Sequence, residues 1–576
     1  MSCAEKRGKR YRCIVNDCGT ITAMKAPFTY ENAMKAAIYP IANSTVDAVF
    51  WTVHTDLAGP YDAPRMWRDY LDATPYEYIC NDGRPMGLYF EKTREVSPEI
   101  YNLEFDRRRY GTAQELWENE GWDMTDLVIQ GARKYGMDAW LSFRQNDMHH
   151  GDAEVHPKFW VDHPEYHLNE GAWGTDGHHG FDRTRVCYNY EYEAVREYMM
   201  APMLAAAKCY DIDGIELDFV RHHYFFKKGQ VRPEVLTEYL RTFKKRLDQI
   251  CKESGKTIKI AVRTMVGVEE NLKWGMDYVT WAKEGLIDYI IAGGLSESPD
   301  MPIQEMVDHV SPYGVLVYGC YDALPYFVPD RKYHSSREFL AASALNLYAQ
   351  GADGVYFFNY GGFSVGRDRR KISRPAGFEG AFLMGDRTML KRADKIYSVG
   401  WGDAGDYPRQ LPKRLLQSTR TEDGKAMRHE LPGPQEVSVQ ISDDLETALK
   451  MNDILHFELQ LMIGSTETGF DGRLVPQVSD KVKVLHTVWP EIDEYVVRVN
   501  GREVPRAAYL ERDALNDWVM LRIDMLRYPE IAVKQGWNTV SMEITKPDAK
   551  IGSQRTVTLD RVFVDIEYSH GESIYK

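Results

Sequence analysis

The sequence lacks the features that mark several other classes of protein. It contains no run of 18 or more apolar residues, which is about the length that a membrane-spanning helix requires. Its formal net charge of −15 supplies no general basic surface of the kind that binds a phosphate backbone. Internal repeats and low-complexity stretches are also absent. We therefore expect neither nucleic acid nor a membrane among its partners.

Signals for metal binding, disulfides and export are equally few. The eight cysteines all lie in the first 320 residues, and no two have CxxC spacing, so we expect reduced thiols and no structural zinc site. The start of the chain is basic but has no apolar run behind it. We expect a cytoplasmic location for the sequence as written, and a periplasmic or secreted one if a leader has been removed.

What the sequence does have is enough apolar material for more than one core. Its 576 residues are 44% hydrophobic and 12% aromatic, and single cores stop growing at roughly 250–300 residues. Two or three domains are expected. The 36 Tyr and 13 Trp include rings that could stack on sugars, although most will serve packing.

The first part of the chain alternates short apolar runs with amphipathic helical stretches. This pattern indicates parallel strands joined by helical crossovers. Eight strands are predicted, at residues 12–17, 45–53, 137–144, 213–220, 258–264, 287–293, 315–321 and 353–360. A last helix is predicted over 378–397. We interpret residues 1–398 as a (β/α)₈ barrel; an open doubly wound sheet is the alternative, but the first strand is not followed by GxGxxG.

Beyond residue 398 the pattern changes to short alternating strands with few helical periods. VSVQIS, EYVVRVNG and VFVDIEY are examples. This pattern predicts a C-terminal, jelly-roll-like β-sandwich over residues 399–576. The sequence leaves open whether that domain binds sugar or only stabilises the barrel.

Two connections in the barrel are far longer than an ordinary βα loop. They cover residues 54–122 and 145–190, and both follow the C-terminal end of a predicted strand. Loops of this length are uncommon unless they are functional, and barrel enzymes keep their active sites at the C-terminal face. A walled pocket at that face is the expected result.

The fourth predicted strand, DGIELDFV, carries two acids. Strand alternation sends Ile215, Leu217 and Phe219 toward the helices, so Glu216 and Asp218 should point into the barrel. Burying an ionised carboxylate without a partner is costly, so such residues are either paired or used. Asp218 is nearer the C-terminal end, where catalysis occurs, whereas Glu216 lies one layer deeper and could instead pair with an arginine.

Arginines recur at corresponding positions of three neighbouring strands. Arg144 ends the third, Arg221 follows the fourth and Arg263 ends the fifth. Such groups could hold the buried carboxylates ionised and oriented, which is the simpler interpretation. They could also grip an anionic substrate, a uronic or sulfated sugar, with paired hydrogen bonds.

The stretch RQNDMHHGD opens the second long connection and supplies further polar groups. Asn146, Asp147 and His149 are typical of sugar-recognition sites, and His222 follows the fourth strand. A metal site is the competing interpretation because histidine pairs recur. Neither HxH nor HExxH spacing is present, so we assign no metal.

Three residues of the last strands should reach the same rim. Glu297 follows the sixth strand, Asp322 follows the seventh and Asn359 lies near the end of the eighth. An acid among them could face Asp218 across the pocket. Glycoside hydrolysis needs two carboxyl groups, about 5–5.5 Å apart for retention and further apart for inversion.

The motifs DGIELDFVRHHYFF, AVRTM and DYVTWAKEGLIDYII together resemble the family-10-like glycosyl hydrolase barrels. The resemblance covers the barrel and implies hydrolysis of a sugar substrate. The strand-four motif is also similar to the DGIDxDxE signature of chitinase-type barrels, but Val220 stands at the position of their general acid. It resembles as well the strand-four aspartate of α-galactosidase-type barrels, which implies a nucleophilic Asp218 with Glu297 or Asp322 as the acid.

Together these patterns predict a glycoside hydrolase that acts on an oligo- or polysaccharide without a cofactor. Asp218 is the expected nucleophile or base, and the second acid is ranked Asp322, Glu216, then Glu297. The expected substrate-binding residues are Arg144, Asn146, Asp147, His149, Arg221, His222, Arg263 and Asn359. The alternatives are a metal-dependent hydrolase or lyase that uses the histidine-rich loops, and a sugar-binding barrel without turnover. The oligomeric state stays open, a homo-oligomer included.

Overall fold

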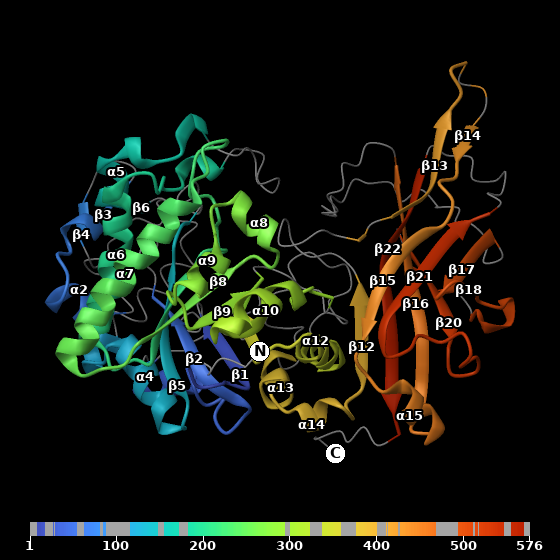
Figure 1. Ribbon diagram of the computed structural model, residues 1–576, viewed down its shortest axis with the longest axis horizontal. Coiled ribbons are helices and arrows are strands. Elements are labelled where there is room, and N and C mark those ends of the chain that lie inside the picture. The colour runs from blue at the N-terminus through green and yellow to red at the C-terminus, as the bar shows by residue number, and fades with distance from the viewer. Residues whose placement is uncertain are drawn as a thin grey trace.

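The structure is a computed structural model in which a barrel and a two-sheet β domain lie side by side, with strand β12 between them (Figure 1). The described residues are 8–17, 27, 29–53, 63–80, 85–87, 116–147, 155–171, 183–293, 300–322, 337–358, 376–399, 410–411, 413–423, 425, 427–467, 494–510, 513–515, 518–545 and 555–569.

The barrel consists of eight parallel strands, each paired with the next in sequence, and the last pairs with the first. The strands are β1 (Cys13–Asp17), β2 (Val46–Thr52), β5 (Asp138–Arg144), β7 (Gly214–Asp218), β8 (Lys259–Thr264), β9 (Tyr289–Ala292), β10 (Leu316–Asp322) and β11 (Gly354–Phe358). All eight predicted strands are confirmed, and closure excludes the open doubly wound sheet.

Helices surround the barrel and bury the outward-facing side chains of its strands. They are α1 (Tyr30–Ala37), α2 (Pro64–Asp69), α4 (Met124–Lys134), α5 (Lys158–Asp162), α6 (Glu193–Cys209), α7 (Pro233–Ser254), α8 (Val268–Lys273), α9 (Tyr278–Lys283), α10 (Gln304–Val310), α12 (Arg337–Ala349), α13 (Ala376–Leu383) and α14 (Arg387–Leu390). Ile215, Leu217 and Phe219 lie in this outer core, as the alternation of strand β7 predicts.

The two long connections contain secondary structure and pair with each other. β3 (Tyr78–Cys80) of the first connection lies between β4 (Pro85–Gly87) and β6 (Val155–Pro157), and β6 belongs to the second connection. In addition, the ring of Phe159 on α5 stacks on Tyr198 of α6 at 4.1 Å. The described parts of the two connections therefore form one joined structure that packs on the barrel helices.

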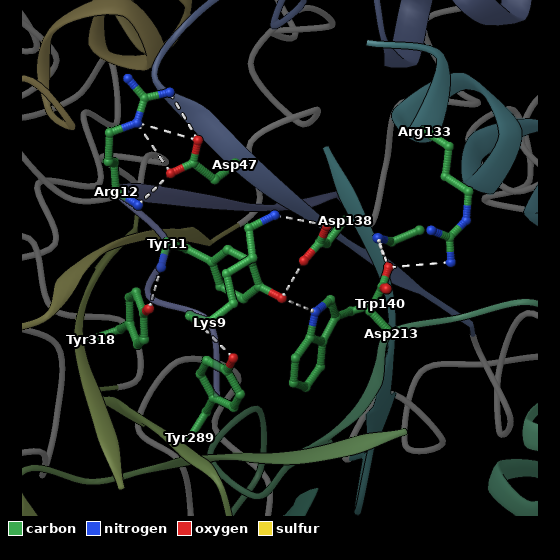
Figure 2. Close-up of polar contacts among 11 residues, drawn as sticks. Lys9, Tyr11, Arg12, Asp47, Arg133, Asp138, Trp140, Asp213, Tyr289 and Tyr318 are labelled. Atoms are coloured by element: carbon green, nitrogen blue, oxygen red, sulfur yellow. Dashed lines mark hydrogen bonds and ion pairs between the residues drawn. The ribbon is translucent and has the colours of Figure 1, made fainter. Parts of the chain in front are cut away.

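At the N-terminal ends of the barrel strands, the segment before β1 closes the interior (Figure 2). The hydroxyl of Tyr11 donates to Asp138 at 2.8 Å and accepts from the indole of Trp140 at 3.1 Å. The backbone N–H of Tyr11 donates to the hydroxyl of Tyr318 at 2.8 Å. Aromatic rings and their hydrogen bonds thus fill this end of the barrel, and polar groups lie at the opposite end.

The C-terminal domain is a β-sandwich, as predicted. One sheet contains β12 (Lys395–Val399), β13 (Lys413–Arg420), β14 (Met427–Glu430), β16 (Ile454–Glu467), β19 (Asp513–Leu515), β20 (Trp518–Asp524) and β22 (Arg555–Tyr568); the other contains β15 (Gln435–Ile441), β17 (Tyr495–Val499), β18 (Arg502–Glu503) and β21 (Gly536–Ile544). Helix α15 (Leu445–Lys450) follows β15. Apolar side chains of both sheets share one core.

The helix predicted over residues 378–397 is wrong at its C-terminal end. The chain forms α13 and α14 and then strand β12, which pairs antiparallel with β22 of the sandwich. The boundary expected at residue 398 falls inside this strand. In the strand, the side chains of KIYSV alternate between the two faces of the sheet. A run of apolar residues this short does not show whether its period is that of a strand or that of a helix.

No helix among the described residues is both long enough and apolar enough to span a membrane. Free thiols are found at Cys13, Cys187, Cys209, Cys251 and Cys320, and all of these except Cys251 are buried.

Candidate active site

The inner face of the barrel is polar near the C-terminal ends of five adjacent strands. The residues are Asn16 of β1, Thr52 of β2, Ser142 and Arg144 of β5, Glu216 and Asp218 of β7, and Arg263 of β8. The neighbouring strands β9, β10 and β11 contribute Ile291, Cys320, Tyr356 and Phe358 to the apolar interior. A polar arc therefore faces a largely apolar one at the end of the barrel where barrel enzymes bind substrate.

Asp218 ends β7 and is held by three hydrogen bonds. Its Oδ1 accepts from the backbone N–H groups of Val220 and Arg221, at 3.1 and 3.0 Å. Its Oδ2 accepts from Nη2 of Arg263 at 2.7 Å. Hydrogen bonds to a charged group contribute roughly 1.5–3 kcal/mol each, so these contacts fix the orientation of the carboxylate.

Arg263 lies deeper than the sequence suggests. The prediction places it at the rim among substrate-binding residues, but its side chain is fully buried inside the barrel. The guanidinium lies 3.7 Å from the ring centre of Phe358 and pairs with Asp218 on the adjacent strand. In this position it orients the carboxylate, the simpler of the two interpretations that the sequence allows.

Glu216 lies one layer below Asp218 and is fully buried. Burial and then the nearby charge of Asp218 raise the pKa of Glu216 to about 7, while Arg263 and the hydroxyls of Ser142 and Tyr356 act in the opposite direction. The Tyr356 hydroxyl donates to Oε2 at 3.0 Å, whereas Oε1 has no hydrogen-bond partner. The site thus contains a carboxyl group that exchanges a proton near neutral pH.

Asn146 anchors the loops and is not available for a substrate. Its side-chain amide donates to the carbonyls of Tyr188 and Tyr224, at 3.0 and 2.8 Å. Its oxygen accepts from the backbone N–H groups of Asp147 and Tyr188, at 3.1 and 3.0 Å. An amide offers two donors and two lone pairs, so all four positions are used. The sugar contact expected of Asn146 is therefore replaced by a role in holding two loops together.

We call Arg144, Asp147 and His222 the mouth cluster. Oδ2 of Asp147 lies 3.3 Å from Nη1 of Arg144, and its Oδ1 lies 3.2 Å from Nδ1 of His222. The three side chains are between 4% and 14% exposed. Asp147 thus joins the end of β5 to the loop after β7 and brings together three of the residues that the sequence predicts to bind substrate.

The same loop carries aromatic rings that the sequence analysis did not select. His223 lies 4.5 Å from Tyr224 and 4.3 Å from Trp274, measured between ring centres. Burial lowers the pKa of His223 to about 3, so its ring is neutral at ordinary pH. All three rings are half-buried. In the sequence, the signal for this group was Tyr224, an aromatic residue directly after the histidine pair that follows β7.

The remaining predicted residues are only partly placed. Arg221 is half-buried, and its backbone N–H donates to Asp218. Asp322 is the last residue of β10, where its Cα pairs with Phe358. His149, Glu297 and Asn359 lie outside the described residues.

Within the described ranges, no group of three or more His, Cys, Asp or Glu residues is placed to hold a metal ion. Of the histidine pairs that prompted the metal hypothesis, those at 149–150 and 178–179 are outside those ranges, whereas His222 and His223 are inside them.

Comparison with known proteins gives matches in solved structures alone. No family model and no curated protein matches the sequence. A Paenibacillus sp. cycloisomaltooligosaccharide glucanotransferase aligns at 9% identity over 96% of this chain and 57% of its own, with a TM-score of 0.31. An α-L-fucosidase from Paenibacillus thiaminolyticus aligns at 14% identity over 65% of this chain and 48% of its own, with a TM-score of 0.36. The catalytic domain of a GH30 xylanase from Talaromyces cellulolyticus aligns at 9% over 94% and 98%, TM-score 0.34.

The chain thus spans about half the length of the first two of these proteins. The closed parallel barrel followed by a β-sandwich rests on the strand pairing itself.

Proposed function

We propose that the protein hydrolyses glycosidic bonds in an oligo- or polysaccharide at the C-terminal end of its barrel. The observation that carries this proposal is the pair of inward-facing carboxyl groups on β7. Asp218 is paired with Arg263, whereas Glu216 has a pKa raised to about 7. Neighbouring carboxyl groups in contrasting environments are typical of sites that divide acid and base roles.

In the proposed reaction Asp218 acts as nucleophile or base. The acid that protonates the leaving oxygen is ranked Asp322, Glu216, then Glu297. Asp322 comes first because it ends a barrel strand, and Glu216 is fully buried beneath Asp218. The proton of Glu216 would then set the charge next to Asp218 without reaching the sugar.

The proposal includes an anionic sugar, uronic or sulfated, as the finer definition of the substrate. Arg144, Arg221 and His222 are the described residues expected to line the subsite, and His149 and Asn359 are added on the strength of the sequence. The rings of His223 and Trp274 offer flat surfaces of the kind on which sugars stack.

The first test is Asp218→Asn, which keeps the shape and removes the charge. Product release is measured on a panel of neutral, uronic and sulfated oligosaccharides. We expect one class to be cleaved. The rate of product release by the variant should be lower by at least about a hundredfold, the usual scale for a positioned acid or base. Asp211→Asn, an 81% exposed aspartate before β7, is the control and should keep its activity.

Retained cleavage in a correctly folded Asp218→Asn protein would place the chemistry elsewhere. Sugar binding without product from the intact protein would favour the non-catalytic barrel. Activity that is lost on chelation and restored by a metal would favour the metal-dependent hydrolase or lyase.

Asp322→Asn tests the acid separately. A general acid matters most when the leaving group is a poor one. We expect this variant to lose activity on natural glycosides and to keep most of it on nitrophenyl glycosides, whose leaving group needs no proton. An equal loss on both substrates would remove Asp322 from this role.

A further inference from the structure

Arg144 has hydrogen-bond donors that the described protein does not use. A guanidinium offers five N–H groups. The side chain is 14% exposed, and the one ion pair that it forms within the described ranges runs from Nη1 to Asp147 at 3.3 Å. Its Nε is buried and has no hydrogen-bond partner among the described residues. A buried cation with so few contacts is costly unless something else accepts from it.

Arg263, at the same end of the barrel, provides the contrast. Its Nη2 lies 2.7 Å from Asp218, and its guanidinium packs on Phe358. The protein has therefore assigned one arginine to its own carboxylate. Arg144 keeps donors at the mouth beyond its contact with Asp147.

The position of Arg144 brings these donors next to the proposed nucleophile. It is the last residue of β5, and its Cα pairs with that of Asp218 on β7. Trp140, four residues earlier on the same strand, lies in the interior core, so alternation turns Arg144 to the same side. Asp147 in turn keeps the guanidinium in place through its second contact, to His222.

We infer that Arg144 binds an anionic group, a carboxylate or a sulfate, on the sugar unit beside the scissile bond. This inference rests on the proposed glycosidase function and names its substrate class. The planar fork of a guanidinium matches the paired oxygens of a carboxylate or sulfate and forms charge-assisted hydrogen bonds with them. Asp147 is a positioning residue, because it acts on the substrate through Arg144 while its other oxygen contacts His222.

The experiment uses pairs of glycosides that differ at one group. One pair compares a C6 carboxylate with a hydroxymethyl group, and the other compares a sulfate with a hydroxyl. The kcat and KM of the wild-type chain, Arg144→Gln and Arg144→Lys are measured on each pair. We expect the wild type to prefer one anionic member, and the pair in which it does so separates uronic from sulfated sugars.

In Arg144→Gln the ratio of kcat/KM for the anionic over the neutral substrate should fall at least about tenfold, mainly through KM, on the scale of one lost charge-assisted hydrogen bond. Arg144→Lys should restore part of it, since it keeps the charge without the fork. Arg65→Gln, which breaks an Arg–Asp pair between α2 and α4, is the matched control and should leave the ratio unchanged. A wild-type preference for neutral sugars, or an equal loss on both members of a pair, would overturn the inference while hydrolysis stands.

If no substrate is cleaved, the proposed function fails and the anion site is tested alone. The Tm of the wild type is then measured with glucuronate, with a sulfated monosaccharide and with glucose. An increase with an anionic sugar that is absent with glucose and absent in Arg144→Gln supports the site without catalysis. No increase with either anion would overturn it.

Discussion

A single residue, Glu216, makes the barrel interior sensitive to pH. Its carboxyl group is fully buried, receives one hydrogen bond from Tyr356 and lies near the charge of Asp218. Arg263 offsets part of that charge, but it is already paired with Asp218. Burial therefore dominates, and the protonated form of Glu216 is favoured up to about neutral pH.

Glu216→Gln should remove this sensitivity. The pKa of Glu216 is about 7 in the folded protein against 4.5 as the ordinary value. Below the lower value both states hold the proton; between the two the unfolded chain loses its proton first, so wild-type stability falls as pH rises. The full effect, reached above pH 7, is about 3 kcal/mol. Glutamine has no carboxyl proton to lose, so the free energy of unfolding of the variant should rise relative to that of the wild type as the pH increases from about 4.5 to about 7.

The measurement is urea unfolding of both proteins at a series of pH values from 4 to 8, with the free energy difference plotted against pH. Glu436→Gln, an exposed residue of β15, serves as the control for the loss of a glutamate as such. A difference that does not change with pH would show that Glu216 has the same charge in both states.

Part of this site could be predicted from the sequence, and the limit is physical. Alternation along one strand is a local property, so the inward direction of Glu216 and Asp218 followed from DGIELDF alone. The depth of Arg263 depends on the register of β8 against β7, and the use of all four positions of Asn146 depends on two distant loops. Neither the register nor the loop contact is encoded within a single segment.

At the scale of elements, Asn146 holds together three segments that form the mouth. It begins the connection after β5, and its amide binds the backbone at Tyr188 and at Tyr224, which belong to the end of that connection and to the loop after β7. Both loops carry candidate site residues. The geometry of the mouth cluster therefore depends on one buried amide.

Asn146→Ala should loosen these loops without unfolding the barrel. It leaves two backbone N–H groups and two carbonyls without their partner, and a hydrogen bond contributes roughly 1 kcal/mol, so the loops should lose about 2–4 kcal/mol. Hydrogen exchange measured by mass spectrometry should rise in residues 183–192 and 220–226 and stay constant in α7. Gln249→Ala, on the exposed face of α7, is the control. Unchanged exchange at Tyr188 and Tyr224 would contradict the anchoring role.

Element prediction failed where tertiary pairing decided the outcome. The barrel strands are apolar runs bounded by helical patterns, and eight of them are recognisable along the chain. KIYSV at β12 is equally apolar, but it becomes a strand because β22, more than 150 residues later, supplies its partner. In the same way the pairing of β3 with β6 joins two connections that look independent in the sequence.

At the scale of the whole molecule, the barrel and the sandwich are joined through β12 and α12. Ala342 of α12 lies in the sandwich core. The side-chain amide of Asn346 donates to the Gln440 carbonyl at 3.1 Å, and Oδ1 of Asn346 accepts from the Ser442 hydroxyl at 2.6 Å. These contacts are buried or partly buried, so we expect the two domains to move as one unit.

A buried ion pair lies at this junction. Lys395 of β12 is fully buried and lies 3.0 Å from Asp443, which also accepts from the hydroxyl of Tyr397 at 2.7 Å. The ammonium group lies 5.0 Å from the ring centre of Tyr568. Burial lowers the pKa of Lys395 although Asp443 raises it, so desolvation outweighs the attraction. A pair of this kind contributes little net stability, yet removal of one partner is expensive.

Lys395→Met should therefore destabilise the protein by about 3–5 kcal/mol, because it leaves Asp443 buried without a counter-charge. Asp443→Asn should cost a similar amount by isolating Lys395. The double variant should cost clearly less than the sum, since no buried charge remains. Urea unfolding of the four proteins gives the coupling directly, with Lys450→Met in the exposed pair on α15 as a control that changes little. Additive single costs would mean that the two groups are solvated independently, and the junction would then depend on the apolar contacts of α12 and β12 alone.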